Sequence, residues 1–109
     1  MSKPASAQSA LDMLILTILS RRGPAHGYAI ANAIQATSED ALRIDEGSLY
    51  PALHRMEEAG WIVAEWMTTE NKRRARIYRI TRTGSNQLAA EKESWKDFSA
   101  AVGRVLRHA

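Results

Sequence analysis

Apolar residues recur every three or four positions through the first half of the chain, the spacing that puts side chains on one face of an α-helix. The first helix predicted in this way begins near Ser9, a candidate N-cap, and ends at Gly23-Pro24. A second helix is predicted over residues 27–37. The core-facing positions of these two helices are Leu11, Leu14, Ile15, Ile18, Leu19, Tyr28, Ile30, Ala31 and Ile34.

A third helix is predicted from Gly47 or Ser48 to Ala59, with Pro51 tolerated in its first turn. Its apolar face comprises Leu49, Ala52, Leu53 and Met56. The connector before it, residues 38–45, alternates apolar and charged positions, which suggests a very short strand. The apolar residues of that alternation are Leu42 and Ile44.

After the third helix the apolar period changes from that of helices to that of strands. Residues 61–67 are rich in aromatic and β-branched side chains, and residues 76–80 alternate, so both are predicted as strands. The polar residues 68–75 form the hairpin tip between them. Thr81 is then placed to cap a long final helix over residues 82–107.

Three helices, a hairpin and a long helix make a mainly α fold with a small β-hairpin. This is the element order of a winged helix-turn-helix domain followed by a long C-terminal helix. We therefore expect a flexible tail over residues 1–8, the winged helix-turn-helix domain over residues 9–82 and a C-terminal dimerisation helix over residues 83–109.

Composition narrows the function classes without choosing one. The 109 residues suit one globular domain, and a net charge of +3 permits a nucleic acid partner without requiring it. The absence of cysteine excludes disulfides, thiolate catalysis and cysteine-based zinc sites, and it suits a reducing cytoplasm. The longest apolar run, residues 13–19, is too short to cross a bilayer, so we expect a cytoplasmic protein without a membrane partner.

Two polar surfaces are candidates for binding DNA. The outer side of the third helix carries a hydroxyl, a phenol, an imidazole and a guanidinium group, which contact phosphates and base edges. The predicted DNA contacts on this side are Ser48, Tyr50, His54 and Arg55, together with Pro51. The hairpin carries six basic residues and no acidic one between positions 72 and 82, and its predicted DNA contacts are Lys72, Arg73, Arg74 and Arg76. A polar helix face or a basic loop on its own is more often an ordinary solvent-exposed surface than a DNA-binding one. Side by side, they form the recognition helix and wing of a DNA-binding domain.

The final helix has a heptad-like seam that predicts packing against another helix. The seam consists of Leu88, Trp95, Phe98, Val102 and Val105, with one gap at Glu91. A helix of about 26 residues spans roughly 39 Å, more than a body this small covers, which favours a homodimer over packing within one chain.

Catalytic and metal chemistry find little support in the sequence. His26, His54 and His108 lie on separate predicted elements. No nucleophile–base pair, paired carboxylate or glycine-rich phosphate loop accompanies them. We expect no catalytic site, no metal and no cofactor.

Several short motifs follow one another in an order typical of one family. They are His26-Gly27-Tyr28, the segment Gly-Ser-Leu-Tyr-Pro-Ala-Leu at 47–53, Glu57, Gly60-Trp61-Ile62, and Tyr78-Arg79-Ile80-Thr81 with Gly84. With them the chain resembles the PadR-like transcriptional regulators, over nearly its whole length after about Leu11. The resemblance implies a homodimeric repressor with the third helix in the major groove and the wing on the flanking backbone. The single C-terminal helix is similar to that of the short members.

Three functions are compatible with the sequence: a repressor that binds an inverted-repeat operator in double-stranded DNA, a winged helix that binds protein instead, and an enzyme. The clustered cations of the hairpin favour the first. A small aromatic or hydrophobic effector, held where the C-terminal helices meet the body, is a further hypothesis that competes with plain interface packing. Trp95 and Phe98 would contact it, with Met13 or Met67 shaping the pocket.

Overall fold

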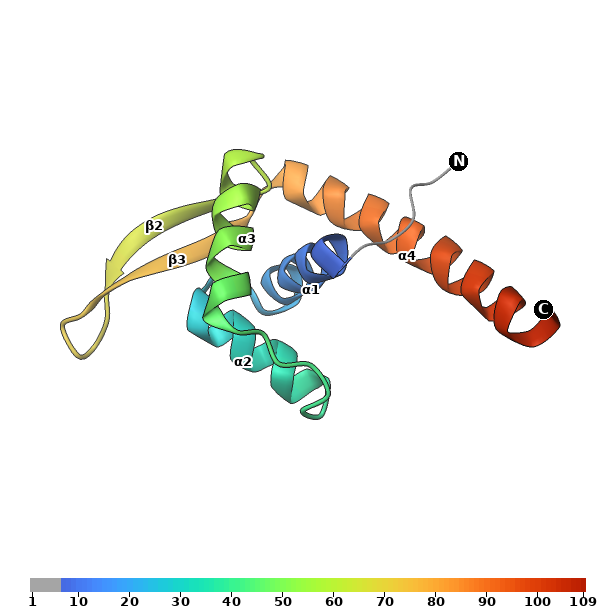
Figure 1. Cartoon of the computed structure of the whole chain (residues 1–109). Coiled ribbons are helices and arrows are strands. Elements are labelled where there is room, and N and C mark those ends of the chain that lie inside the picture. The colour runs from blue at the N-terminus through green and yellow to red at the C-terminus, as the bar shows by residue number, and fades with distance from the viewer. Residues whose placement is uncertain (1–6) are drawn as a thin grey trace.

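The computed structural model describes residues 7–109, which form a helical body with a projecting hairpin and a projecting helix (Figure 1). The elements in chain order are α1 (Ala7–Arg22), β1 (Ala25–His26), α2 (Gly27–Thr37), α3 (Glu46–Glu58), β2 (Ile62–Thr68), β3 (Arg74–Ile80) and α4 (Arg82–His108). The predicted fold class, a winged helix-turn-helix with a long C-terminal helix, is confirmed.

The core lies where α1, α2 and α3 meet beneath the sheet. Its largest fully buried side chains are Ile15, Leu16, Leu19, Ile30, Leu49, Leu53, Met56 and Ile62. The predicted apolar face of α3 is therefore confirmed. Tyr28, predicted to face the core, is instead 68% exposed. The buried side of α2 is formed by Gly27, Ile30, Ala33 and Ile34, and Tyr28 points away from it.

Two helices begin earlier than predicted. The helix α1 already includes Ala7, so the predicted tail is shorter than eight residues, and its first six residues lie outside the described part of the chain. In α3 the N-cap is Asp45, whose side chain accepts a hydrogen bond from the Ser48 amide at 2.8 Å. Pro51 consequently lies in the second turn of the helix and not in the first.

The connector between α2 and α3 contains no strand, contrary to expectation. Glu39 and Asp40 have positive φ angles of 54° and 66°, so the chain turns directly after α2. Ile44 packs partly against the core, which accounts for one of the two apolar positions in the predicted alternation.

The sheet has three antiparallel strands in the order β1-β3-β2. The pairing of Ile62 with Ile80 and of Thr68 with Arg74 sets the hairpin register. Both strands reach further toward the tip than predicted, β2 by one residue and β3 by two, which shortens the connecting turn to residues 69–73. The strand β1 pairs with β3 through only Ala25 and His26, too few residues to give a period in the sequence.

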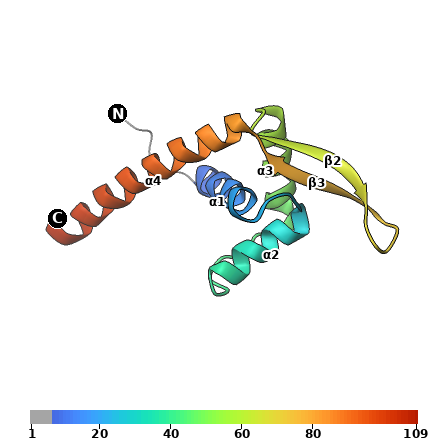
Figure 2. The same cartoon turned by 180° about the vertical axis from the view of Figure 1, so that it is seen from behind.

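A tight junction fixes the start of α4. The Thr81 hydroxyl accepts from the Gly84 amide at 3.0 Å, as predicted for the N-cap, and lies 2.6 Å from the Gly60 carbonyl oxygen. A side chain at Gly84 would collide with the backbone carbonyl of Trp61. From this junction α4 passes α1 and then leaves the body, on the side opposite to the hairpin tip (Figures 1 and 2). The described chain measures 57 × 29 × 23 Å along its principal axes.

Candidate nucleic-acid interface

The outward face of α3 presents most of the residues predicted to meet DNA. Ser48, Tyr50, Pro51 and His54 are all exposed. The His54 imidazole Nε2 lies 2.7 Å from the Glu58 carboxylate, one turn further along the same exposed face. A face that combines a hydroxyl, a phenol and an imidazole can donate to phosphates and to base edges.

Arg55, also predicted to contact DNA, has a structural partner instead. Its guanidinium donates two hydrogen bonds, of 2.8 and 2.9 Å, to the carboxylate of Asp12 on α1. The Asp12 side chain is 5% exposed and needs a countercharge, so the pair joins α1 to α3. The hydrogen bond to Asp12 raises the pKa of Arg55 above its ordinary value, although partial burial acts in the opposite direction. The geometry therefore assigns Arg55 to the body of the domain.

The wing, residues 62–80, ends in an ordered turn. The Thr69 amide donates to the Arg73 carbonyl at 2.8 Å, and the Lys72 amide donates to the Thr69 carbonyl at 2.9 Å. Lys72 occupies the left-handed region at φ 59°, which tightens the turn. Lys72, Arg73 and Arg74, all predicted DNA contacts, are exposed on this turn and at the start of β3.

Arg76 differs from the other predicted wing contacts because it binds the body. Its Nη2 donates to the Glu57 carboxylate of α3 at 2.8 Å. Its Cζ also lies 5.7 Å from the ring centroid of Trp66 and 5.8 Å from that of Tyr78. These contacts hold the wing against α3, and the contact of Arg76 with a phosphate stays a prediction.

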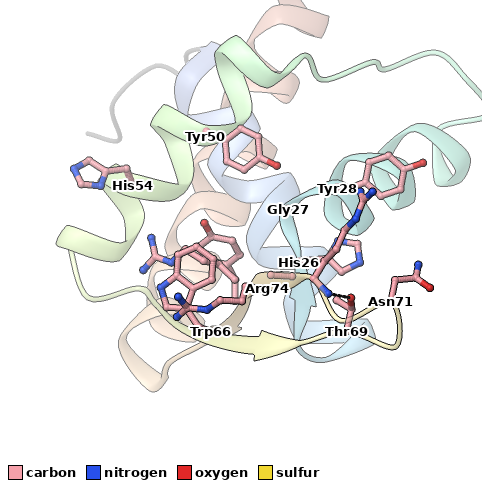
Figure 3. Close-up of a pocket in the computed structure, with 13 residues that line it drawn as sticks. His26, Gly27, Tyr28, Tyr50, His54, Trp66, Thr69, Asn71 and Arg74 are labelled. Atoms are coloured by element: carbon pink, nitrogen blue, oxygen red, sulfur yellow. Dashed lines mark hydrogen bonds between the residues drawn. The ribbon is translucent and has the colours of Figure 1, made fainter.

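An open groove of about 980 Å³ separates α3 from the wing (Figure 3). It is lined by His26, Gly27, Tyr28, Tyr50, His54, Trp66, Thr69, Asn71, Arg73, Arg74, Ala75, Arg76 and Tyr78. No carboxylate is among these residues, whereas three are arginines. The groove is therefore a basic channel with aromatic walls.

The start of α2 supplies a third wall of this groove that sequence reasoning missed. His26 is the N-cap of α2, and its Nδ1 accepts from the Ala29 amide at 3.2 Å. Its ring stacks at 6.0 Å on Tyr28, whose exposed phenol faces outward beside it. Gly27 packs so closely under Tyr50 that a Cβ there would lie 3.1 Å from the Tyr50 ring. The only signal in the sequence was the His-Gly-Tyr motif.

Tyr78 closes the floor of the groove between the sheet and α3. Burial raises the pKa of its phenol above the ordinary value of 10.0, although the nearby charge of Arg76 acts in the opposite direction. The phenol therefore stays neutral at physiological pH.

The predicted seam of α4 divides into two parts. Leu88 is 6% exposed and belongs to the core of the body, so it does not join the exposed seam. Trp95, Val102 and Val105 are exposed, and Leu106, which the predicted seam omitted, is exposed as well. The Trp95 and Phe98 rings lie 6.3 Å apart. Because α4 leaves the body, this apolar stripe has no cover within the described chain.

One of the two methionines proposed to shape an effector pocket lies elsewhere. Met67 is on the wing, paired with Ala75, at the opposite end of the molecule from the exposed part of α4 (Figure 1). Met13 packs against the core from α1. Among the described residues no cluster of three or more histidine and carboxylate side chains could hold a metal ion. No described helix is long and apolar enough to span a membrane.

Comparison with known proteins identifies relatives of the whole fold. A family model described as the PadR-like family of transcriptional regulators matches residues 15–90. A transcriptional regulator of Mycobacterium tuberculosis is 32% identical over 68 residues, which cover 62% of this chain and 63% of that protein. An uncharacterized protein of a Streptomyces fradiae transposon is 38% identical over 98 residues, 90% of this chain but 26% of that protein. The match thus spans less than two thirds of either relative.

Two solved structures extend the comparison to three dimensions. A transcriptional regulator from Clostridium thermocellum has a TM-score of 0.82 at 29% identity, covering 89% of this chain and 93% of its own. A PadR family transcriptional regulator from Eggerthella lenta has a TM-score of 0.78 at 29% identity, covering 94% of this chain and 86% of its own.

Proposed function

The chain belongs to the PadR-like family of transcriptional regulators, and we propose that it acts as a homodimeric repressor bound to an inverted-repeat operator in double-stranded DNA. The observation that carries this proposal is the groove between α3 and the wing, whose lining contains no carboxylate and includes Arg73 and Arg74 besides Arg76, the arginine that pairs with Glu57. Duplex DNA is a polyanion, and a channel of this charge beside an exposed polar helix matches its surface.

In this arrangement α3 enters the major groove and the wing follows the backbone. Ser48, Tyr50, Pro51 and His54 would then face base edges and adjacent phosphates, because they share the outward face of α3. Lys72, Arg73 and Arg74 would neutralise phosphates from the wing. Sequence preference would come from α3, and affinity shared by all sequences would come mostly from the wing.

The second subunit is supported by the uncovered apolar stripe of α4. Trp95, Val102 and Val105 repeat at intervals of seven and three residues, which suits packing against the same helix of a second copy. A two-fold axis between two such chains would place two recognition helices on the same face of DNA. The half-sites of the operator would then lie about one helical turn apart.

The stripe also supports the effector hypothesis in a reduced form. We propose that an aromatic or hydrophobic molecule binds at Trp95 and Phe98 between the two subunits, without Met67. In a Trp61→Phe, Trp66→Phe variant the only indole is Trp95, so its emission should change when such compounds are titrated. An unchanged emission with every compound that releases DNA would place the effector elsewhere.

Selection of DNA from a random pool tests the main proposal. The full chain should enrich duplexes that share an inverted repeat, and its affinity for them should exceed that for unselected DNA by about a thousandfold or more. A pool that shows no shared sequence after repeated rounds would contradict operator binding. Enrichment of a single unrepeated site would contradict the two-fold arrangement.

A further inference from the structure

The Trp66 side chain on β2 is largely exposed, with a relative exposure of 57%. It lies on the groove side of β2, opposite Arg76 in the hairpin register and across from Tyr50 on α3 (Figure 3). Its neighbour Met67 is exposed to a similar degree, 52%, but belongs to the other face of the same strand. The indole therefore forms part of the groove wall.

A cation lies directly over this ring. The Cζ atom of Arg74 is 4.8 Å from the centroid of the Trp66 ring, within the range of a cation–π contact. Arg74 lies on the same face of the hairpin, near the tip. The wing thus presents a flat apolar surface and a guanidinium next to each other.

A DNA strand offers the matching pattern, because its backbone alternates apolar deoxyribose rings with charged phosphates. No carboxylate is among the residues that line the groove, and phenols from Tyr28 and Tyr50 form the wall opposite the wing. If α3 lies in the major groove and the wing reaches toward the minor groove, the backbone strand between the two grooves passes over Trp66.

We propose that Trp66 is a DNA-binding residue whose ring packs on a deoxyribose of that strand, while Arg74 beside it contacts the adjoining phosphate. This inference rests on the proposed DNA binding and adds an apolar, sequence-independent contact to it. Because no charge is involved, the contribution of Trp66 should be insensitive to salt, unlike that of the wing cations.

Substitution tests the contact against a matched control. Trp66→Ala should weaken binding to a duplex of about 25 base pairs, which holds two half-sites, by about tenfold. The slope of log affinity against log salt should not change. Met67→Ala, an adjacent and similarly exposed residue on the opposite face, should bind like the parent. Equal losses for the two variants, with unchanged thermal unfolding, would overturn the proposal.

A double variant distinguishes a direct contact of Trp66 with DNA from a role in which Trp66 only positions Arg74. In an Arg74→Ala background the cation that Trp66 would position is gone. Trp66→Ala should nevertheless weaken binding several-fold further if the indole itself contacts DNA. No further loss in that background would reduce Trp66 to a support for Arg74 and overturn the proposed contact.

Fluorescence gives a readout that does not depend on affinity. In a Trp61→Phe, Trp95→Phe variant the sole indole is Trp66, and bound duplex should protect it from acrylamide quenching. In the matched Trp61→Phe, Trp66→Phe variant, which keeps Trp95, DNA should leave quenching unchanged.

Anisotropy of labelled DNA reports binding separately in the same samples. Bound DNA with an unprotected Trp66 would overturn this inference alone. An absence of DNA binding by the parent chain would overturn both the inference and the proposed function.

Discussion

The ion pair between Asp12 and Arg55 ties α3 to α1. Because Asp12 is buried, Arg55→Ala would leave an uncompensated carboxylate, a change that typically costs about 3–5 kcal/mol. Arg55 is itself partly exposed, so solvent screening should reduce the loss to below that range, to about 2–3 kcal/mol. Urea unfolding at fixed protein concentration measures it.

Arg79 provides the control for this prediction. It pairs with Glu65 at 3.0 Å, and the two side chains are 53% and 57% exposed. Arg79→Ala should therefore lower the free energy of unfolding by less than about 1 kcal/mol. Equal costs for the two variants would show that the Asp12 pair is not structural. Arg55→Ala should also leave the salt dependence of DNA binding unchanged.

Sequence periodicity identified which residues of α3 are buried but not what the exposed ones touch. The partner of Arg55 lies 43 residues earlier in the chain, and no local pattern links the two. Tyr28 was assigned to the core because it lies in the apolar pattern of α2, whereas it is 68% exposed and the buried side of this helix begins at its neighbour Gly27. Both errors concern contacts between elements, which a single sequence does not encode locally.

The charged residues of the wing lie on a turn that is held by backbone hydrogen bonds. The contribution of each of them to DNA binding can therefore be measured by single substitutions. Arg73→Ala should weaken binding to all duplexes alike and lower the salt slope by roughly one unit. Titrations at several salt concentrations, by anisotropy, give this slope. Arg79→Ala, on the other face of the wing, should keep the parental slope. A parental slope in Arg73→Ala would remove that residue from the interface.

The junction between the wing and α4 depends on Gly84. Gly84→Ala forces a Cβ against the Trp61 carbonyl and should destabilise the protein by about 2–4 kcal/mol, as strained packing does. Gly103→Ala, in the projecting part of the same helix, meets only the flexible end of Arg107. It should stabilise by about 0.5–1 kcal/mol, the helix preference of alanine over glycine. Thermal unfolding of both variants tests the contrast, which a harmless Gly84→Ala would contradict.

The elements that could be predicted are those with a long amphipathic pattern or an identifiable capping residue. The helix α4 has both a long amphipathic period and the Thr81 cap, and its start was predicted to the residue. The strand β1 is two residues long and exists only through its pairing with β3, so it carried no signal. The alternation in the connector had no strand to pair with, and positive φ angles in the preceding turn show that the chain reverses there.

The proposed assembly of two chains uses the projecting half of α4. Val102→Asp should place a charge in the apolar stripe and make the protein sediment as a monomer at concentrations where the parent is a dimer. Its affinity for the operator should fall to that of one subunit bound to one half-site. Ala100→Asp, about 200° away on the same helix, should remain dimeric. A dimeric Val102→Asp variant would assign the subunit interface to another surface.

The shape of the molecule also explains what the heptad pattern left open. Periodicity places Leu88 and Val105 on one seam, but the helix α1 covers the first part and not the second. Only the three-dimensional arrangement shows that α4 extends beyond the body (Figure 2). The heptad pattern alone therefore did not show which part of the seam is buried in the body and which part is exposed.

Hydroxyl-radical footprinting of the selected duplex tests most directly whether two recognition helices bind one operator. The account predicts two protected windows on each strand, related by a two-fold axis and about 10 base pairs, or a multiple of that, apart. The flanking backbone next to each half-site should also be protected, because the wing follows it. A single protected window at saturating protein, or protection without symmetry, would contradict the account.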